Sequence, residues 1–503
     1  MKNLKYWLGI ALMGYASHGF AQDASDALRY SRTQFGGSAR TLGIGGATTA
    51  LGADLGSLSS NPAGLGLYQK SEVTFTPGVG IGNTKSTGLG SQTSDARNSL
   101  HIGGIGIAFT NRLPDDDNTS DWRAGTFAIG VTRVNDFNTS FRYRGTVDEN
   151  RSFFQYLRES PATQAQLDAE YGQNGENITT LDGLAYGGYL TDFDNNGRIF
   201  TVGRQGPINV SETVLSTGSQ MQYDFGYGAS YRDRLYVGGA IGIVTTRYDL
   251  TREFREGTDN AASQFNNLLL RDYVTTKGTG FNARIGLIYR ASDYVRVGAS
   301  VQSPTFSKLT DTYGTSLNTT FNRAVDTNNT ITSAAVSTQP GEYTYNITTP
   351  FRAAVGASVV IGKYGFVTGD AEYVNYGQAR LNTDNSGNST TGAFDRQNDD
   401  IRNLYQSALN LRLGGEARYD IFRFRLGYAR YGDPFKNSDF DRTRNYFTGG
   451  VGLRQKNFFL DLAGVYNTDK RFYQPYTLNA GNEPTINVNG TKFTTSATVG
   501  FVF

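Results

Sequence analysis

The sequence predicts an all-β protein, a transmembrane antiparallel β-barrel of about fourteen strands preceded by an N-terminal segment of different composition. Hydrophobic and polar residues alternate with a period of two from residue 71 onward. Short turns alternate with long polar connections, and the final strand ends on an aromatic residue, Phe503. Together these observations favour a barrel that crosses a membrane with its strands.

The first residues have the pattern of a secretory signal peptide. Lys2 and Lys5 precede a mostly apolar run over residues 6–15, and small residues follow up to Ala21. The run is shorter than the roughly 18 apolar residues of a transmembrane helix, so it indicates export and not a membrane span. We expect cleavage after Ala21, which makes Gln22 the first mature residue, and no lipid anchor, because the chain has no cysteine.

The stretch from residue 407 to 419 shows the alternation most clearly. Leu409 and Leu413 fall on one face, whereas Arg412 and Glu416 fall on the other. Such a strand needs water on one side and an apolar environment on the other. In a barrel, this places the leucines against lipid and the charged residues in the lumen.

Alternation of this kind divides the chain into about fourteen candidate strands, an even number, as single-chain outer-membrane barrels have. Tight turns join many of them, and long polar stretches, which we expect to be extracellular loops, join others. The predicted strands lie near 71–83, 99–110, 123–143, 219–231, 234–249, 279–291, 293–303, 344–361, 363–381, 407–420, 422–431, 443–456, 458–467 and 491–503. The predicted tight turns lie at 232–233, 291–293, 362, 420–421 and 456–457, and the predicted loops at 146–215, 250–278, 304–343, 382–406 and 468–490.

The last strand carries Ala497, Val499, Phe501 and Phe503 at alternate positions. It resembles the C-terminal signal by which outer-membrane barrels are recognised, so the barrel-assembly machinery is an expected partner through Phe503. A soluble jelly roll or propeller could share the alternation, but would need neither a terminal aromatic strand nor strands of this length. We expect an integral protein of the bacterial outer membrane, in contact with its lipid, and a monomer.

Composition argues against several functions. The chain has 47 basic and 45 acidic residues, and removal of Lys2 and Lys5 leaves 45 of each, so no charge excess favours nucleic acid. With no cysteine, and with His101 as the only histidine after the leader, a zinc cluster is not available. Asp370 and Glu372 lie on one strand face, which favours salt bridges over acid–base catalysis. We therefore expect no enzyme, no catalytic residue, no cofactor and no metal.

Residues 22–70 differ from the barrel region, which we place at 71–503. They are rich in small residues and lack strand alternation, and we expect short helices around 47–51 and 54–59. Pro62 has no N–H and restricts Asn61 to extended geometry, which excludes a plain helix or a paired strand at that point. The glycines that would permit close packing inside a narrow lumen are Gly43, Gly45, Gly46 and Gly64.

Two motifs in this segment resemble the hatch of the FadL/TodX family of outer-membrane transporters for hydrophobic compounds. They are residues 39–47 (ARTLGIGGA) and residues 61–65 (NPAGL), and the stretches 278–290, 345–359 and 424–435 resemble the family's barrel strands. The resemblance covers essentially the whole mature chain. It implies a fourteen-stranded barrel with residues 22–70 inside as a hatch, or plug.

The resemblance also implies passive transport of hydrophobic molecules such as long-chain fatty acids. The ligand would enter among the extracellular loops, pass inside the barrel wall and leave sideways through a kink in the third strand. That kink would fall within residues 127–138, where no residue identifies it. Asn61, Pro62 and Ala63, with the adjoining Gly64, match the hatch motif whose rearrangement would open the route; an ordinary turn without a gating role is the alternative.

Two apolar groups in the predicted loops are candidates for ligand capture. Extracellular helices that carry them could form an apolar groove, although the same side chains could equally pack the loops together. The candidates are Phe153, Phe154, Tyr156 and Leu157, at helical spacing, and Leu268, Leu269 and Leu270.

A short acidic run resembles the start of a calcium-binding loop. Asp192, Asp194 and Asn196 occupy alternate positions, but the twelfth position is Gly203 and not the glutamate of that motif. A solvated turn built on these side chains is the better interpretation.

Two other functions stay open beside transport. One is a structural or partner-binding barrel, such as the secretion-system shuttle proteins that share this fold. The other is haem uptake, which is disfavoured because haem iron usually takes a His, Cys, Met or Tyr ligand and only tyrosine is plentiful in this chain.

Overall fold

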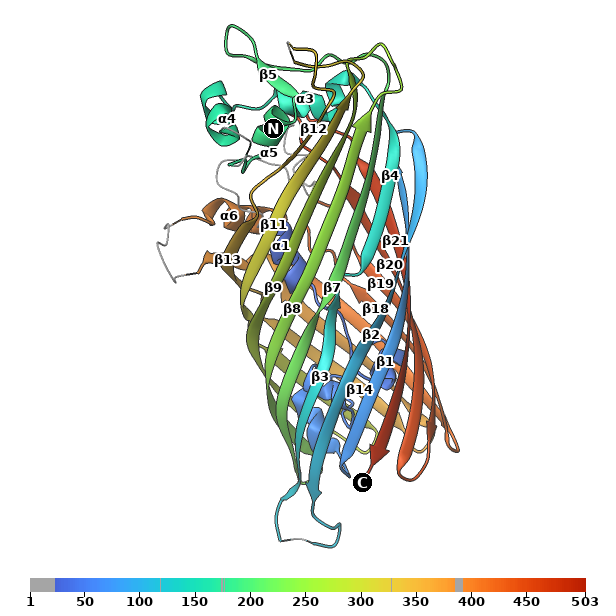
Figure 1. Cartoon of the computed structure of the whole chain (residues 1–503). Coiled ribbons are helices and arrows are strands. Elements are labelled where there is room, and N and C mark those ends of the chain that lie inside the picture. The colour runs from blue at the N-terminus through green and yellow to red at the C-terminus, as the bar shows by residue number, and fades with distance from the viewer. Residues whose placement is uncertain (1–22, 118, 173–174, 176, 327, 385–391) are drawn as a thin grey trace.

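The structure, a computed structural model, describes residues 23–117, 119–172, 175, 177–326, 328–384 and 392–503. The predicted signal peptide, residues 1–21, lies outside the described residues. The chain forms one large barrel of strands, with the start of the described chain inside it and helical loops over one end (Figure 1). We call that end the loop end, and the opposite end, which carries the C-terminus, the turn end.

The wall of the barrel is a ring of fourteen antiparallel spans. Most spans are single strands: β1 (Glu72–Gly88), β2 (Ser91–Arg112), β7 (Ile208–Tyr231), β8 (Leu235–Gly257), β9 (Phe265–Arg290), β17 (Ser407–Tyr419), β18 (Phe422–Tyr431), β19 (Arg444–Arg454), β20 (Phe458–Tyr473) and β21 (Ile486–Val502). The other spans combine consecutive strands: β3 (Trp122–Asp136) with β4 (Thr139–Val147), β10 (Val295–Gln302) with β11 (Phe306–Phe321), β13 (Gly341–Thr348) with β14 (Arg352–Ile361), and β15 (Gly365–Asn375) with β16 (Arg380–Thr383).

The first and last strands close the ring. β1 pairs with β21 in antiparallel register, from Glu72 opposite Val502 to Thr87 opposite Asn487. Beside this ladder, the N–H of Phe503 donates to the carbonyl oxygen of Ser71 at 3.0 Å. Closure removes the free edges that the two ends of an open sheet would have. The predicted antiparallel barrel and its number of strands are confirmed.

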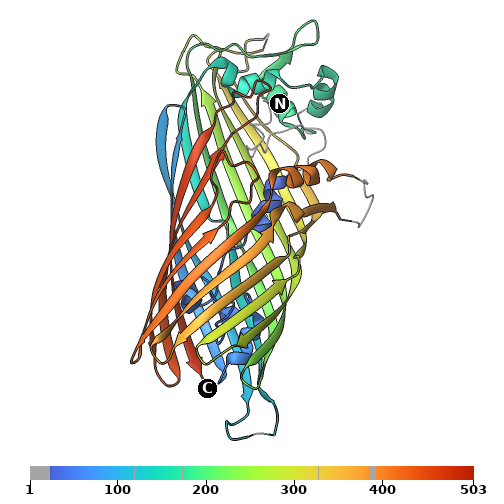
Figure 2. The same ribbon diagram turned by 180° about the vertical axis from the view of Figure 1, so that it is seen from behind.

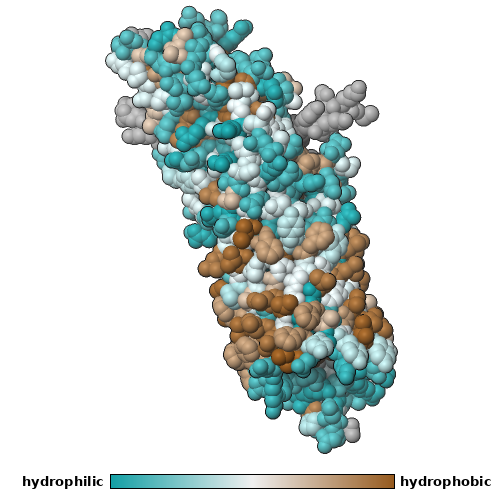
Figure 3. Space-filling view, turned by 90° about the vertical axis from the view of Figure 1, so that its right-hand side faces the viewer, coloured by the Kyte–Doolittle hydropathy of each residue, from teal (hydrophilic) through white to brown (hydrophobic). Residues whose placement is uncertain are grey.

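An apolar band surrounds the half of the barrel nearer the turn end. Leu409, Leu411 and Leu413 are 53%, 44% and 59% exposed, whereas Arg412 between them is 8% exposed. In the space-filling view, hydrophobic side chains gather in this half, and polar residues cover the surface above and below it (Figure 3). A band of this kind fits the hydrocarbon layer of a bilayer, so the alternation assigned the two faces of this strand correctly.

Tight turns join the strands at the turn end, as predicted. Arg232 and Asp233 have φ angles of 52° and 50° between β7 and β8, and Asp420 has a φ of 50° between β17 and β18. Left-handed backbone at these positions is typical of two-residue hairpin turns. The connection between β2 and β3, described at residues 113–117 and 119–121, is longer and projects from this end (Figure 1).

Several strands continue far beyond the apolar band toward the loop end. β7, β8 and β9 contain 24, 23 and 26 residues, against the roughly 9–11 that cross a bilayer. Residues 250–278 and 304–343 are therefore largely strand, and their prediction as loops was wrong. The physical reason is a reversal of polarity: here the inward faces are apolar and the outward faces meet water, as with buried Leu268 and exposed Arg271 on β9.

Short helices and strands cover the loop end, where the views from front and back both place them (Figures 1 and 2). None of the helices in the described part of the chain is long and apolar enough to cross a membrane. The elements of the loops are η3 (Glu149–Arg151), α3 (Phe153–Arg158), α4 (Gln164–Tyr171), α5 (Leu181–Gly187), β5 (Thr191–Phe193), β6 (Ile199–Thr201), β12 (Ser333–Ser337), η4 (Tyr376–Gln378) and α6 (Asp395–Leu404).

Residues 23–70 run along the inside of the wall, from the loop-end half toward the turn end (Figures 1 and 2). Their elements are α1 (Ala24–Ser31), α2 (Ala39–Gly43) and the 3₁₀ helices η1 (Leu55–Leu58) and η2 (Pro62–Leu67). The helix expected near residues 54–59 is present as η1. The one expected at 47–51 is absent, because Gly46 and Gly52 on either side adopt φ angles of 74° and 70°, which end a right-handed helix.

Candidate functional site

Asn61 ties the N-terminal segment to the barrel wall. Its side-chain Nδ2 donates hydrogen bonds to the carbonyl oxygens of Thr49 at 2.7 Å, Leu287 at 3.2 Å and Ala299 at 3.3 Å. Leu287 and Ala299 are direct partners on β9 and β10. Asn61 Oδ1 accepts from the N–H of Ala63 and so caps η2, whose first residue is the adjacent proline. One buried amide thus joins three backbone segments.

The wall beneath the segment is built from glycines that face inward. A Cβ atom at Gly286 would approach Asn61 Oδ1 to less than 3.0 Å, and one at Gly238 would approach the carbonyl oxygen of Pro62 as closely. Only glycine lets two backbones meet at this distance. We call the wall glycines with such contacts to the segment the glycine band: Gly228, Gly238, Gly286, Gly298, Gly414 and Gly427.

The glycines predicted within the segment serve the same close packing. Gly45 and Gly46 adopt left-handed φ angles of 66° and 74°. A Cβ atom at Gly64 would lie 2.8 Å from the Cα of Gly52, and one at Gly43 would lie 3.5 Å from the Cα of Gly450 on β19. These positions therefore allow the segment to fold back on itself and to lie against the wall.

Polar side chains of the wall hold the segment as well. Thr49 donates from both its N–H (2.9 Å) and its Oγ1 (2.8 Å) to Asp370 Oδ2. Arg284 donates to the carbonyl oxygen of Leu58 at 2.6 Å and pairs with Asp224 at 3.1 Å. These contacts come from β15 and β9, so the segment is fixed to separate parts of the ring.

Ion pairs between neighbouring strands line the lumen at the same level. Glu372 lies 3.2 Å from Arg352 and 3.1 Å from Arg412. Arg425 lies 2.8 Å from Glu416 and 2.7 Å from Asp461. The interpretation of Glu372 as a salt-bridge residue is thereby confirmed, whereas its neighbour Asp370 holds the segment.

The space left between segment and wall is small and polar. A cavity of about 80 Å³ lies there, and its lining includes the charged side chains Arg284, Arg352, Glu372 and Arg412 together with Ser59 and Ser60. A straight passage down the lumen would bring a hydrophobic molecule against these charges. This geometry argues against an apolar route along the barrel axis.

The third span is interrupted between β3 and β4, at Phe137 and Asn138. Asn138 Nδ2 donates to Asp136 Oδ1 at 2.8 Å and to the carbonyl oxygen of Gly218 at 3.2 Å. Gly218, on the neighbouring β7, has a φ of 113°. The break falls within the interval 127–138, in which the sequence showed no marker; the Asp-Phe-Asn run is the local signal in hindsight.

The break leaves an incomplete joint in the wall. Within the described residues, ladder pairing joins β2 to the third span only from Gly104 to Arg112. We call the boundary between residues 91–103 of β2 and residues 133–147 of the third span the seam. Side chains close its upper part: Ser140 Oγ donates to Asp95 Oδ2 at 2.6 Å.

Residues 34–37 of the N-terminal segment close the lower part of the seam from inside. The N–H of Gln34 donates to the carbonyl oxygen of Val134 at 2.9 Å. A Cβ atom at Gly36 would collide with the carbonyl oxygen of Arg133, and Gly37 lies against Gly104 of β2. No sequence pattern predicted a role for this stretch; the adjacent glycines 36 and 37 are its one local signal.

His101 lies on β2 along the seam, as a half-buried residue between Leu100, which is 83% exposed, and Ile102. It faces inward near Gly78 of β1. It therefore lies in the middle of β2 (Ser91–Arg112) and not at one end of that strand.

The candidate capture residues lie in a closed core between the loops and the barrel. Phe153, Phe154 and Leu157 are 0–1% exposed, and the ring of Phe154 lies 4.8 Å from that of Phe265. Leu268 and Leu270 face the same core from β9, whereas Tyr156 and Leu269 are partly buried. Phe153, Phe154 and Leu157 therefore share one buried core with Leu268 and Leu270, and Leu269 lies outside that core.

A buried ion pair holds the loop against this core. Glu256 Oε2 accepts from the N–H of Phe153 at 2.9 Å, and its other oxygen lies 2.6 Å from Arg204. Burial raises the pKa of Glu256, and Arg204 opposes that effect. The guanidinium of Arg204 also lies 3.7 Å from the ring centre of Phe154, which ties the charge to the aromatic core.

Aromatic rings of this core run from the loops down to the break in the third span. Phe153 and Phe254 lie at the top, 6.0 Å from Tyr476. Further along, Phe141 packs against Tyr473 at 5.1 Å. We call the set that continues to the break the aromatic column: Phe153, Phe254, Tyr476, Tyr473, Phe141, Phe137, Tyr248 and Tyr30.

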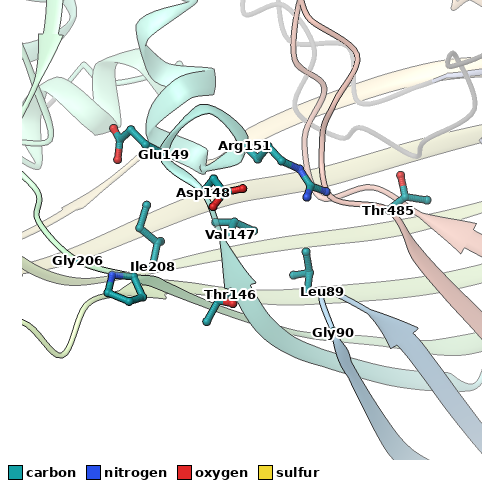
Figure 4. A pocket seen from close by; sticks show the side chains of 11 residues that line it. Leu89, Gly90, Thr146, Val147, Asp148, Glu149, Arg151, Gly206, Ile208 and Thr485 are labelled. Atoms are coloured by element: carbon teal, nitrogen blue, oxygen red, sulfur yellow. The ribbon is translucent and has the colours of Figure 1, made fainter.

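An open pocket of about 730 Å³ lies at the loop end of the seam (Figure 4). The β1–β2 turn contributes Leu89, and the end of β4 contributes Val147. Val147 and Ile208 in its lining belong to the core that contains the aromatic column. Asp148, Glu149 and Arg151 give the pocket a charged rim. Its residues are far apart in the sequence, so no local pattern could reveal it.

The calcium-like run forms a turn. Asp194 Oδ1 accepts hydrogen bonds from the N–H groups of Asn196 and Arg198, each at 2.9 Å. This is the backbone-capping geometry of a solvated turn, as the sequence favoured.

Comparison with known proteins gives a match of structure but not of sequence. No family model and no curated protein matches the chain. The toluene transporter TbuX of Ralstonia pickettii is similar in structure, with a TM-score of 0.50 and 15% identity over 93% of this chain and 99% of that one. A FadL homologue of Pseudomonas aeruginosa has a TM-score of 0.50 and 12% identity over 93% and 98% of the two chains. The resemblance to the FadL/TodX family is thus confirmed for the fold, and the chain is a fourteen-stranded barrel of the kind found in these transporter structures.

Proposed function

We propose that this protein is a passive channel of the bacterial outer membrane for hydrophobic molecules, with residues 22–70 as its hatch and residues 71–503 as its barrel. The observation that carries the proposal is the aromatic column, which leads from the loop-end pocket to the break in the third span at the level of the apolar band. The lumen below the column is polar and narrow, so a hydrophobic molecule gains nothing by continuing along the axis.

Capture begins at the loop end, which faces the extracellular medium. The charged rim of the pocket suits the polar head of an amphiphile, and Leu89, Val147 and Ile208 offer an apolar floor. Phe153, Phe154, Tyr156 and Leu157, with Leu268 and Leu270, line the next stage when the loops separate, whereas Leu269 lies on the outward face of β9. Their close packing in the present state means that the ligand replaces side-chain contacts as it enters.

Release occurs sideways through the seam. Residues 34–37 block the seam from inside, because they occupy the place where β2 and the third span do not pair. We call this stretch, which must move for release, the door. Asn61, Pro62, Ala63 and Gly64 with the glycine band hold the rest of the hatch, so that movement is confined to the stretch before α2. A molecule that leaves through the seam enters the bilayer directly and does not pass the charged side chains Arg284, Arg352 and Glu372 of the lower lumen.

The substrates we propose are long-chain fatty acids or other hydrophobic compounds of similar width. The name of TbuX describes it as a toluene transporter, and the rings that form the column here suit aromatic and acyl groups alike. The protein needs no cofactor or metal for such passage. We further propose that it is exported by its signal peptide, is assembled through its terminal Phe503, and functions as a monomer.

Uptake measurements test the proposal. The protein is expressed in a host that lacks its own transporter for hydrophobic compounds, and the entry of radiolabelled oleate and toluene is compared with that in cells carrying the empty vector. We expect faster entry of at least one compound. Proteoliposomes with the purified barrel should equilibrate that compound without an energy source, and no gain over empty vesicles contradicts the proposal.

A further inference from the structure

Three basic side chains gather on the outer face of the barrel, just beyond the apolar band. They are Arg247 on β8, Lys277 on β9 and Lys308 on β11, three strands that lie side by side (Figure 1). Arg247 is directly opposite Lys277, and Lys277 is opposite Thr310, two residues along β11 from Lys308. All three are exposed, and the side chains of Arg247 and Lys308 are 65% and 57% accessible. We call them the outer basic patch.

The charges of this patch are only partly balanced within the described part of the chain, because two carboxylates face its three cations. Arg247 pairs with Asp249 at 2.9 Å, and Lys308 pairs with Asp384 at 2.7 Å. Among the ion pairs of the described residues, none includes Lys277. Like charges directly opposite each other destabilise a pair of strands, so an external anion beside Lys277 would stabilise its placement against Arg247.

The position of the patch relative to the bilayer identifies the anion. Phe281 and Phe306 are 61% and 45% exposed immediately below it, with their ring centres 5.5 Å apart. Four residues of β9, about 13 Å along the strand, separate Phe281 from Lys277. The patch therefore lies where lipid head groups of the outer leaflet meet their acyl chains, and its aromatic neighbours face those chains.

We propose that the outer basic patch binds a phosphorylated, acylated sugar lipid of the outer leaflet, of the lipid A type. The phosphates lie between Arg247, Lys277 and Lys308, and acyl chains cover Phe281 and Phe306. Charge-assisted contacts to phosphate from several cations favour a doubly charged head group over a single carboxylate. The site is on the outside of the wall, and it is independent of the transport route.

Binding to the purified, delipidated barrel in a non-ionic detergent tests this inference. Diphosphorylated lipid A, the same lipid after removal of both phosphates, phosphatidylglycerol and inorganic phosphate are titrated separately and followed by native mass spectrometry. We expect lipid A to bind at least tenfold more tightly than each of the other three. Equal binding of the dephosphorylated lipid, of phosphatidylglycerol or of free phosphate overturns the proposal, because the patch would then not select a phosphorylated acyl sugar.

Two double variants place the site. Arg247→Gln with Lys277→Gln removes two charges of the patch and should weaken lipid A binding at least tenfold. Arg255→Gln with Arg271→Gln removes two charges from the same strands farther from the band, around Glu253, and should leave binding unchanged. Equal loss in both, or no loss in the first, overturns the assignment. Gel electrophoresis of unheated and heated samples checks that each variant is folded, because a folded barrel changes its mobility on heating.

Discussion

Asn61 Oδ1 lies so close to Gly286 that a Cβ atom at position 286 would approach it to less than 3.0 Å. The same asparagine bonds to the carbonyl oxygen of Leu287, the next residue of β9. The absence of a side chain at Gly286 therefore leaves the room that the Asn61 side chain occupies against β9. This relationship makes the anchoring of the hatch testable from either side.

Substitution of the wall should loosen the hatch. Gly286→Val places a side chain where Asn61 lies, so we expect the segment to shift inward and the polar lumen to conduct. Planar-bilayer recordings should show larger and more frequent ion currents, and cells should become more sensitive to large hydrophilic antibiotics. The control is Gly239→Ala on β8, where a Cβ atom has its nearest neighbour at 3.6 Å. Wild-type conductance in Gly286→Val would show that the glycine does not position the hatch.

Substitution of Asn61 itself separates its donor from its acceptor role. Asn61→Asp keeps the cap on Ala63 but turns a carboxylate oxygen toward three carbonyl oxygens, whereas Asn61→Ala removes both roles. Loss of a buried hydrogen-bond partner costs about 1–3 kcal/mol, and we expect a larger loss for the aspartate because of added repulsion. Limited proteolysis of the hatch in the intact barrel measures the order: aspartate fastest, then alanine, then wild type. Equal rates for aspartate and wild type would contradict the role of the amide as a donor.

Sequence reasoning reached those features that a local pattern encodes. The alternation around Arg412 gave the lipid and lumen faces, and Asn61 with Pro62 marked the anchor of the segment. It failed where the outward face of a strand meets lipid along one part of its length and water along another. Leu268 and Leu270 lie on β9 above the apolar band and face inward, so they belong to a strand and not to a loop helix. Apolar and polar residues still alternate in that part of β9, but the alternation alone does not show which of the two faces meets water.

Contacts between distant segments were also out of reach. The bond from Gln34 to Val134 joins two stretches 100 residues apart in the chain, and neither carries a pattern that points to the other. The loop-end pocket likewise combines Leu89 with Thr485. The second pair follows from closure of the ring, which brings β21 beside β1, and closure is a property of the whole barrel.

A cross-link at the proposed door should block uptake. The natural chain has no cysteine, so Gln34→Cys with Val134→Cys can be joined by a short bifunctional thiol reagent with a cleavable disulfide. We expect entry of the transported compound to fall at least tenfold on cross-linking and to recover on reduction, because residues 34–37 can then leave the seam again.

The matched control joins the hatch to the wall away from the seam. Ser358 Oγ donates to the carbonyl oxygen of Ala50 at 3.2 Å, so Ala50→Cys with Ser358→Cys cross-links a part that we propose to be stationary. Uptake should stay within twofold of the untreated protein. If this cross-link blocks uptake as strongly as the one at Gln34, the whole hatch moves and the door is not confined to residues 34–37.

Truncation of Phe137 should widen the end of the aromatic column. Its ring is 6% exposed and lies 5.4 Å from the ring of Tyr248 and 5.9 Å from that of Tyr30, directly at the break in the third span. Phe137→Ala removes the ring between column and seam, so we expect uptake of the transported compound to rise severalfold. The cavity should also lower stability by about 3–5 kcal/mol, seen as a lower temperature for the heat-modified gel shift.

The matched control for this truncation is Phe321→Ala, which removes an equally buried ring, 6% exposed, from the same core at the far end of β11. It should lower stability by a similar amount and leave uptake unchanged, because its ring borders neither the column nor the seam. A gain of uptake in both variants would mean that general loosening of the core admits substrate. A gain in neither would place the route elsewhere, since a ring on the path must hinder passage in the closed state.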